Sequence, residues 1–88
     1  MLESTIQKQI ITRLDKAGWI VDKPVTRSHK GFPDLTAYKD GTTVFIEVKR
    51  PGEKPTKIQE FWILKLRMSG FDAYVMSDWQ ELRKYELI

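Results

Sequence analysis

The sequence has no cysteine and a single histidine among its 88 residues. The lack of cysteine excludes a disulfide framework and a thiolate metal site, and no second histidine supports a metal role for His29. No apolar run approaches the roughly 20 residues that a transmembrane helix needs. The first 16 residues carry early acids and a later base, unlike a charged-then-apolar signal peptide. We therefore expect a soluble, cytoplasmic protein with no membrane partner.

Linkers, internal repeats and low-complexity segments are also lacking, so residues 1–88 are expected to form one domain. Folding of a chain this short buries only about two-thirds of its accessible surface, which leaves modest stability. Association with a second copy is therefore plausible.

The net charge is only +3, but the basic residues are concentrated in the middle of the chain. Between Lys23 and Arg67 there are ten basic and five acidic residues, whereas the rest of the chain has five basic and seven acidic ones. A basic stretch of this kind is typical of a protein that binds a phosphate backbone. A solvated surface would explain the charge excess equally well.

Hydrophobic periodicity predicts an α/β fold with the element order α-β-β-β-α-β-α. The Asp40-Gly41 dipeptide is a hairpin signal between the second and third strands. The first three strands are expected to form an antiparallel meander, and the second helix to return the fourth strand parallel to the third. The first two expected helices cover 2–17 and 57–69, and Thr56 caps the second of them. A last helix is expected to follow a cap at Ser77 or Asp78. The expected strands cover 19–23, 34–39, 42–49 and 71–76.

The predicted helix 57–69 is apolar around more than half of its circumference, which is wider than one sheet face can cover. Either it packs tightly under the last helix, or part of it forms a dimer interface. The small core slightly favours the interface.

An acid and a base share one face of the predicted interior strand, because Glu47 and Lys49 are two residues apart. A hairpin folded at Asp40-Gly41 places Asp34 opposite Glu47, within about 5 Å if both face the same side. Two carboxylates that close repel each other unless a cation lies between them. Mg²⁺ suits such a site, since it prefers oxygen ligands and keeps water and substrate phosphates in its shell. Lys49 could then assist the attacking water.

The pattern of these residues resembles a known family of nucleases. Pro33-Asp34, followed after twelve residues by Glu47-Val48-Lys49, resembles the signature of the PD-(D/E)XK nucleases on their restriction-endonuclease-like α-β-β-β-α-β core. The wider pattern is similar to the VRR-NUC (virus-type replication-repair nuclease) branch in a stand-alone form. That wider pattern comprises Glu3-Ser4-Thr5-Ile6-Gln7, Gly31-Phe32-Pro33-Asp34-Leu35, Ile46-Glu47-Val48-Lys49 and Gln59.

The resemblance implies a role for each of these positions. Asp34 and Glu47 would bind Mg²⁺ or Mn²⁺ together with the carbonyl of Val48, and Lys49 would orient or activate the attacking water. Glu3 would reach the metal directly or through water. It could instead be a first-turn acid that favours the helix dipole. Gln59 would hydrogen-bond near Lys49 or the scissile phosphate. It could instead be an exposed helix residue.

The implied function is that of a magnesium-dependent DNA endonuclease. By analogy with Holliday-junction resolvases of this fold, we expect a homodimer that cuts branched DNA and takes no small-molecule substrate. A catalytically silent DNA-binding module and a sequence-specific restriction-type nuclease are the alternatives. The expected phosphate contacts are Arg27, Ser28 and Lys30 on one rim of the site and Arg50, Lys54 and Lys57 on the other.

Overall fold

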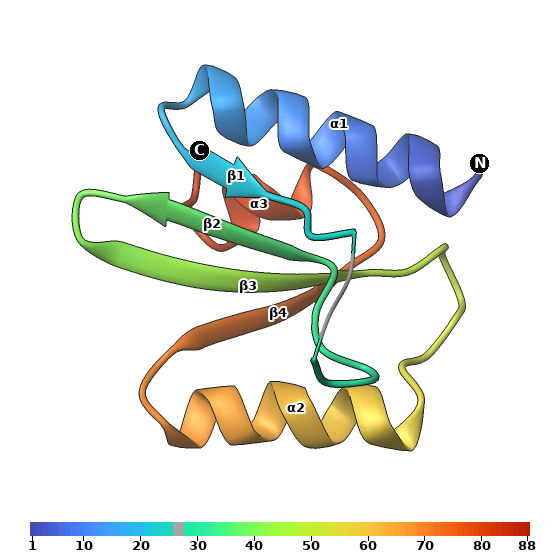
Figure 1. Ribbon diagram of the computed structural model, residues 1–88. Coiled ribbons are helices and arrows are strands. Elements are labelled where there is room, and N and C mark those ends of the chain that lie inside the picture. Colours follow the sequence, from blue (N-terminus) through green and yellow to red (C-terminus); the bar gives the residue numbers. More distant parts are fainter. Residues whose placement is uncertain (26–27) are drawn as a thin grey trace.

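The chain alternates helices and strands in the order that the sequence predicts (Figure 1). The computed structural model describes residues 1–25 and 28–88. Predicted element ends differ from the observed ones by one residue in most cases. The elements are α1 (Glu3–Lys16), β1 (Ile20–Asp22), β2 (Leu35–Lys39), β3 (Thr42–Val48), α2 (Lys57–Met68), β4 (Asp72–Met76) and α3 (Glu81–Lys84).

The four strands form one mixed sheet in the order β1-β2-β3-β4. β1, β2 and β3 pair antiparallel, and β4 pairs parallel to β3, so β3 is an interior strand as expected. Asp40 and Gly41 turn the β2–β3 hairpin with φ values of 49° and 77°. Two consecutive positive φ angles are the geometry of a type I′ turn, which matches the right-handed twist of the strands it joins.

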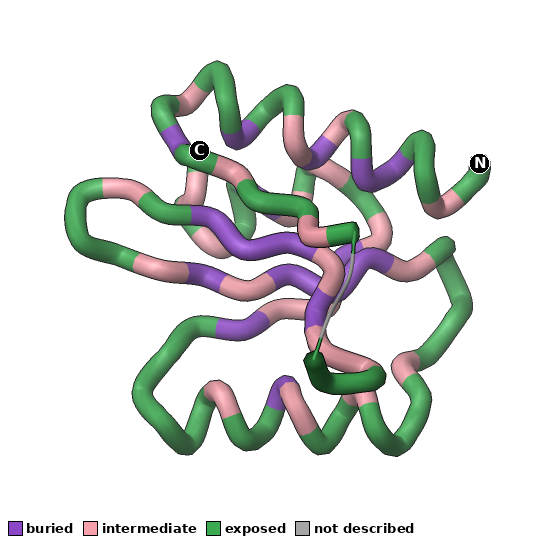
Figure 2. The backbone as a smooth tube through the Cα atoms, viewed as in Figure 1, coloured by how far each residue is buried: buried purple, intermediate pink, exposed green. Residues whose placement is uncertain are grey.

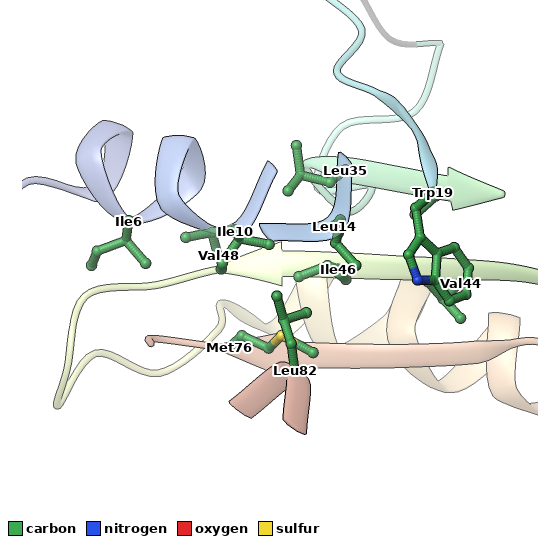
Figure 3. Packing of buried hydrophobic residues seen from close by; sticks show 11 residues of the cluster. Ile6, Ile10, Leu14, Trp19, Leu35, Val44, Ile46, Val48, Met76 and Leu82 are labelled. Atoms are coloured by element: carbon green, nitrogen blue, oxygen red, sulfur yellow. The ribbon is translucent and has the colours of Figure 1, made fainter. Parts of the chain in front are cut away.

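Helices cover both faces of this sheet (Figure 1). α1 and α3 lie on one face, where Ile6, Ile10 and Leu14 point from α1 toward β3 (Figure 3). These three side chains are four residues apart, so they form a single stripe on the helix. The buried cluster between α1, α3 and the sheet also contains Trp19, Leu35, Ala37, Val44, Ile46, Val48, Met76 and Leu82.

α2 covers the opposite face and is far less buried (Figure 2). Ile63 is the residue of α2 that the sheet buries, whereas Phe61, Leu64 and Met68 are 52%, 56% and 88% exposed. The wide apolar stripe expected from the sequence is therefore real, and most of it faces solvent. No helix in the described ranges 1–25 and 28–88 is long and apolar enough to cross a membrane.

The last helix is shorter than predicted, and the prediction that Ser77 or Asp78 caps it is wrong. α3 begins at Glu81, and Gln80 occupies the position before it. The Glu81 carboxylate accepts hydrogen bonds from the backbone N–H groups of Ser77 and Asp78 at 2.7 and 3.2 Å. The Asp78 carboxylate accepts one from the N–H of Gln80 at 2.7 Å. These bonds satisfy the backbone N–H groups of the turn that precedes α3.

Candidate active site

Glu47 is a charged residue in the interior of the sheet. The neighbouring residues Ile46 and Val48 point into the core on the α1 side, so Glu47 points toward α2. Its side chain is 2% exposed. Oε2 accepts a hydrogen bond of 3.0 Å from Nε2 of Gln59 and lies 3.7 Å from Nζ of Lys49. Oε1 is buried and accepts no hydrogen bond from an N–H group in the described part of the chain.

This environment raises the pKa of Glu47 from an ordinary 4.5 to about 8. Burial is the largest cause, because it penalises the charged carboxylate, and the negative charge of Asp34 is the second. Lys49 opposes the rise, while a hydrogen bond with Asp34 and the charge of Glu3 add to it. A carboxyl group in this environment keeps its proton to a higher pH than usual, unless a bound cation displaces that proton.

Asp34 lies where the hairpin register predicts it. Leu35 pairs with Ile46, and extending this register by one residue places Asp34 opposite Glu47. Oδ2 of Asp34 accepts a hydrogen bond of 2.9 Å from the backbone N–H of Val48. This bond fixes the Asp34 carboxylate at the end of β3, and the preceding Pro33 is fully buried.

α2 contributes to the site through its first turn. The N–H of Gln59 donates to the Thr56 hydroxyl at 3.3 Å, and Oε1 of Gln59 accepts from the N–H of Thr56 at 2.9 Å. This reciprocal pair is a capping box, which stabilises the start of the helix. The other end of the same amide donates to Glu47, so Gln59 connects the helix cap to the buried carboxylate.

Gln59 therefore hydrogen-bonds near Lys49, as expected, because its amide donates to the Glu47 oxygen that lies 3.7 Å from the Lys49 ammonium. Thr56 caps the helix as predicted, but sequence reasoning missed its link to the site. The spacing T-x-x-Q is a recognisable capping-box signal and could have drawn attention to the pair. Nothing in the sequence shows that the amide would also reach Glu47.

Lys49 follows β3 directly, and its backbone N–H donates to the carbonyl of Met76 at 2.9 Å. This bond extends the pairing between the two strands beyond Val48. The Lys49 side chain is 12% exposed and lies on the same face as Glu47, as predicted. The Lys49 ammonium therefore lies within 4 Å of the Glu47 carboxyl group, beside the same site.

Glu3 is the first residue of α1, and its charge has the smallest effect among the causes that raise the pKa of Glu47. Within residues 1–25 and 28–88, no three His, Cys, Asp or Glu side chains form a group that could hold a metal ion. A metal here would be bound by the Asp34–Glu47 pair, backbone oxygen and water. Direct ligation by Glu3 stays a prediction.

The described residues among the predicted phosphate contacts are exposed, and they lie on two segments beside α2 and at its start. Ser28 and Lys30 lie on the first, whose Lys30 carbonyl accepts a hydrogen bond of 3.0 Å from Nε1 of Trp62. Lys54 lies on the second, and Lys57 is the first residue of α2. Arg50 is also exposed but is engaged by Glu53, with Nε 2.5 Å from Oε1. Arg27 lies outside the described residues.

Comparison with known proteins gives a consistent result. The family model of the VRR-NUC domain matches residues 2–79. A protein of Acyrthosiphon pisum secondary endosymbiont phage 1, named "Putative nuclease p44", is 41% identical over 58 residues. That match covers 65% of this chain and 62% of the relative, so it spans less than two-thirds of the relative's length. A solved structure titled "VRR_NUC domain" superimposes with a TM-score of 0.84 at 27% identity, over 96% of this chain and 92% of that one.

Proposed function

This chain belongs to the VRR-NUC domain family, and we propose that it is a metal-dependent endonuclease that hydrolyses phosphodiester bonds in DNA. The observation that carries the proposal is the buried Glu47 carboxyl group, which lies beside the Asp34 carboxyl group and has one oxygen that no N–H group of the described residues satisfies. Burying a carboxylate for stability alone is unfavourable. The arrangement is expected where a cation completes the site.

The donor set fits Mg²⁺ or Mn²⁺. Asp34 and Glu47 supply two carboxylates from paired strands, and Mg²⁺ is usually bound by one or two carboxylates together with waters and substrate phosphates. The Val48 carbonyl is a further candidate ligand. When bound, the metal supplies Lewis acidity toward the phosphate and lowers the pKa of a coordinated water.

The remaining residues of the site position and assist these groups. Gln59 holds Oε2 of Glu47 from a capped helix end. The Lys49 ammonium, 3.7 Å from Oε2, can orient the attacking water and stabilise negative charge that develops on the phosphate. Glu3 would hold a water at the edge of the site. Ser28, Lys30, Lys54 and Lys57 would bind the phosphates on either side.

We further propose that the protein acts as a homodimer on branched DNA, with one active site on each of two strands. The support is the exposed face of α2, where Phe61, Leu64 and Met68 line a hollow of about 600 Å³. A second copy related by a two-fold axis would cover the same face on both protomers. Residues 1–25 and 28–88 form no separate element for reading bases, so recognition of DNA shape fits better than recognition of sequence.

Substitution of Lys49 tests the nuclease proposal. Lys49→Met keeps the length of the side chain and removes its charge, so the protein should fold and bind DNA. Cleavage should fall at least about 100-fold, as expected when a group that acts on the transition state is lost. The matched control is Lys84→Met, on an exposed lysine of α3, which should cut like wild type. Linear, flapped, single-stranded and four-way DNA are assayed with Mg²⁺, with Mn²⁺ and with EDTA.

The outcomes separate the proposal from its alternatives. Cleavage that is equal in Lys49→Met and wild type contradicts the assigned mechanism. Binding without cleavage of any DNA form, with either metal, would mean a silent DNA-binding module. Discrete cuts in linear plasmid DNA would mean a restriction-type nuclease instead of one that selects branched DNA.

A further inference from the structure

The outer face of α1 carries a second basic surface, on the opposite side of the sheet from α2. Two shallow grooves run along the helix and share Thr5, Lys8 and Thr12. Figure 2 shows that most of the outward-facing turns of α1 are exposed. One groove, of about 580 Å³, is completed by Ser4, Ile11 and Lys23, and the other, of about 320 Å³, by Gln9, Arg13, Lys16 and Trp79. We call the residues that line the two grooves the α1 surface.

The chemistry of the α1 surface is that of a phosphate-binding surface. Its polar side chains are four cations, three hydroxyls and one amide, and no carboxylate of the described residues lines either groove. Asp15, on the same helix, lies outside both sets of lining residues. Lysine, arginine, hydroxyl and amide side chains make most of the protein contacts to DNA phosphates.

One cation of the α1 surface is held in place by an aromatic ring. The Arg13 guanidinium lies 3.6 Å from the ring centroid of Trp79. The guanidinium of Arg83 lies 5.2 Å from the same ring. Stacking of this kind leaves the N–H groups at the rim of a guanidinium available to an oxygen ligand. Trp79 therefore orients a charge at the groove.

The α1 surface also has a useful position relative to the active site. The N-terminal end of α1 lies on the same side of the molecule as the end of β3 and the start of α2 (Figure 1). Glu3, at that end, is close enough for its charge to act on Glu47. At about 1.5 Å per residue, the helix from Ser4 to Lys16 is about 18 Å long. That length corresponds to roughly five base pairs of duplex DNA at about 3.4 Å each.

We infer that the α1 surface binds the phosphate backbone of a duplex arm of the substrate, beginning beside the active site and running away from it. The inference rests on the proposed function, because it assigns a path to the DNA that the active site would cut. The contacts go to phosphates, so they add affinity that is independent of base sequence and sensitive to salt.

The test measures the salt dependence of DNA binding without cleavage. A fluorescein-labelled duplex of about 30 base pairs is titrated in EDTA by fluorescence anisotropy between about 50 and 200 mM salt. Each phosphate contact contributes about 0.9 to the slope of log K against log salt. Lys8→Gln should therefore reduce the slope by about one and weaken binding about five- to ten-fold at about 0.1 M salt. Lys8→Gln/Lys16→Gln should reduce the slope by about two.

Lys84→Gln is the matched control, because it removes the same charge from α3 outside both grooves, and its slope should equal that of wild type. Circular dichroism should show that each variant is folded, because the substituted side chains are exposed. If the Lys8 and Lys84 variants have equal slopes while wild type binds and cuts DNA, the inference is wrong and the proposed function stands. If wild type neither binds nor cuts any DNA, both are wrong.

Discussion

At the scale of single residues, Glu47 has the most unusual environment in the described part of the chain. It combines near-complete burial, a neighbouring carboxylate and a pKa raised to about 8. The folded protein therefore retains a proton on Glu47 over a pH range in which the unfolded chain has lost it. Protonation and metal binding should compete for this one group.

The raised pKa makes the stability of the metal-free protein depend on pH. Between 4.5 and about 8, the folded state binds more protons than the unfolded state. The free energy of unfolding should therefore fall as pH rises through this window, because stability falls wherever the unfolded state binds fewer protons. At about 1.4 kcal/mol per pKa unit, Glu47 should account for a fall in the free energy of unfolding on the order of a few kcal/mol across this window.

Glu47→Gln tests this prediction because it replaces the carboxyl group with a neutral amide of the same shape. Urea unfolding is measured in EDTA at several pH values from about 5 to about 9. The free energy of unfolding should depend less steeply on pH in this variant than in wild type. Glu60→Gln, at an exposed position of α2, is the control and should keep the wild-type dependence. An unchanged pH dependence in Glu47→Gln would mean that Glu47 does not hold the proton.

At the scale of elements, the contact between α2 and the segment that leads to Asp34 aligns the two halves of the site. Gly31 has a φ of +83° and approaches Ile58 closely. A Cβ atom at Gly31 would lie 2.8 Å from Cγ2 of Ile58 and 3.2 Å from its backbone carbonyl carbon. Only glycine fits here, and Asp34 follows three residues later.

Gly31→Ala should therefore displace α2 or the segment before Asp34. Gly52→Ala is a close control, because Gly52 has a φ of +86° and a methyl group there would meet no atom of the described residues within 4 Å. The free energy of unfolding should fall by about 1 kcal/mol in both variants, because alanine is strained at a positive φ. In Gly31→Ala the clash with Ile58 should lower the free energy of unfolding by about 1–3 kcal/mol more. Urea unfolding measures both losses.

Two further measurements connect this contact to the site. Gly31→Ala should cut DNA more slowly than Gly52→Ala, because its clash shifts the segment that carries Asp34. Adding Ile58→Ala should recover part of the lost stability, since it removes the methyl group that clashes. Equal losses in the two glycine variants would show that the contact with Ile58 is easily relieved.

At the scale of the whole molecule, the two faces of the sheet are covered unequally. α1 and α3 bury a continuous apolar cluster, whereas α2 leaves Phe61, Leu64 and Met68 exposed. A chain of 88 residues with this much exposed apolar surface on one helix gains stability if a second copy covers it.

Leu64→Lys should convert the proposed dimer into a monomer, because it places a charge in the centre of the apolar face. Size-exclusion chromatography with light scattering measures the mass. Ile20→Lys is the control, since Ile20 is a 70% exposed apolar residue on β1, and it should leave the dimer intact. A wild-type protein that is monomeric at the assay concentration would contradict paired cleavage of two strands.

Local patterns were sufficient to predict much of the fold. The period of apolar residues, the Asp40-Gly41 turn and the helix boundaries depend on neighbours along the chain. They indicated the element order, the interior position of β3 and the register that places Asp34 opposite Glu47. The family resemblance seen in Asp34, Glu47 and Lys49 agrees with the match of the VRR-NUC domain model.

The rest depends on contacts between residues far apart in the sequence. The raised pKa of Glu47 follows from how α2 and β2 exclude water and bring Asp34 near, which no local pattern encodes. The bond from Gln59, the delayed start of α3 and the exposed face of α2 depend in the same way on how elements pack. Residue types and their spacing were enough to establish which side chains could form a site. Their protonation, their partners and the surfaces left open around them were fixed by the folded arrangement, because burial and charge act through space.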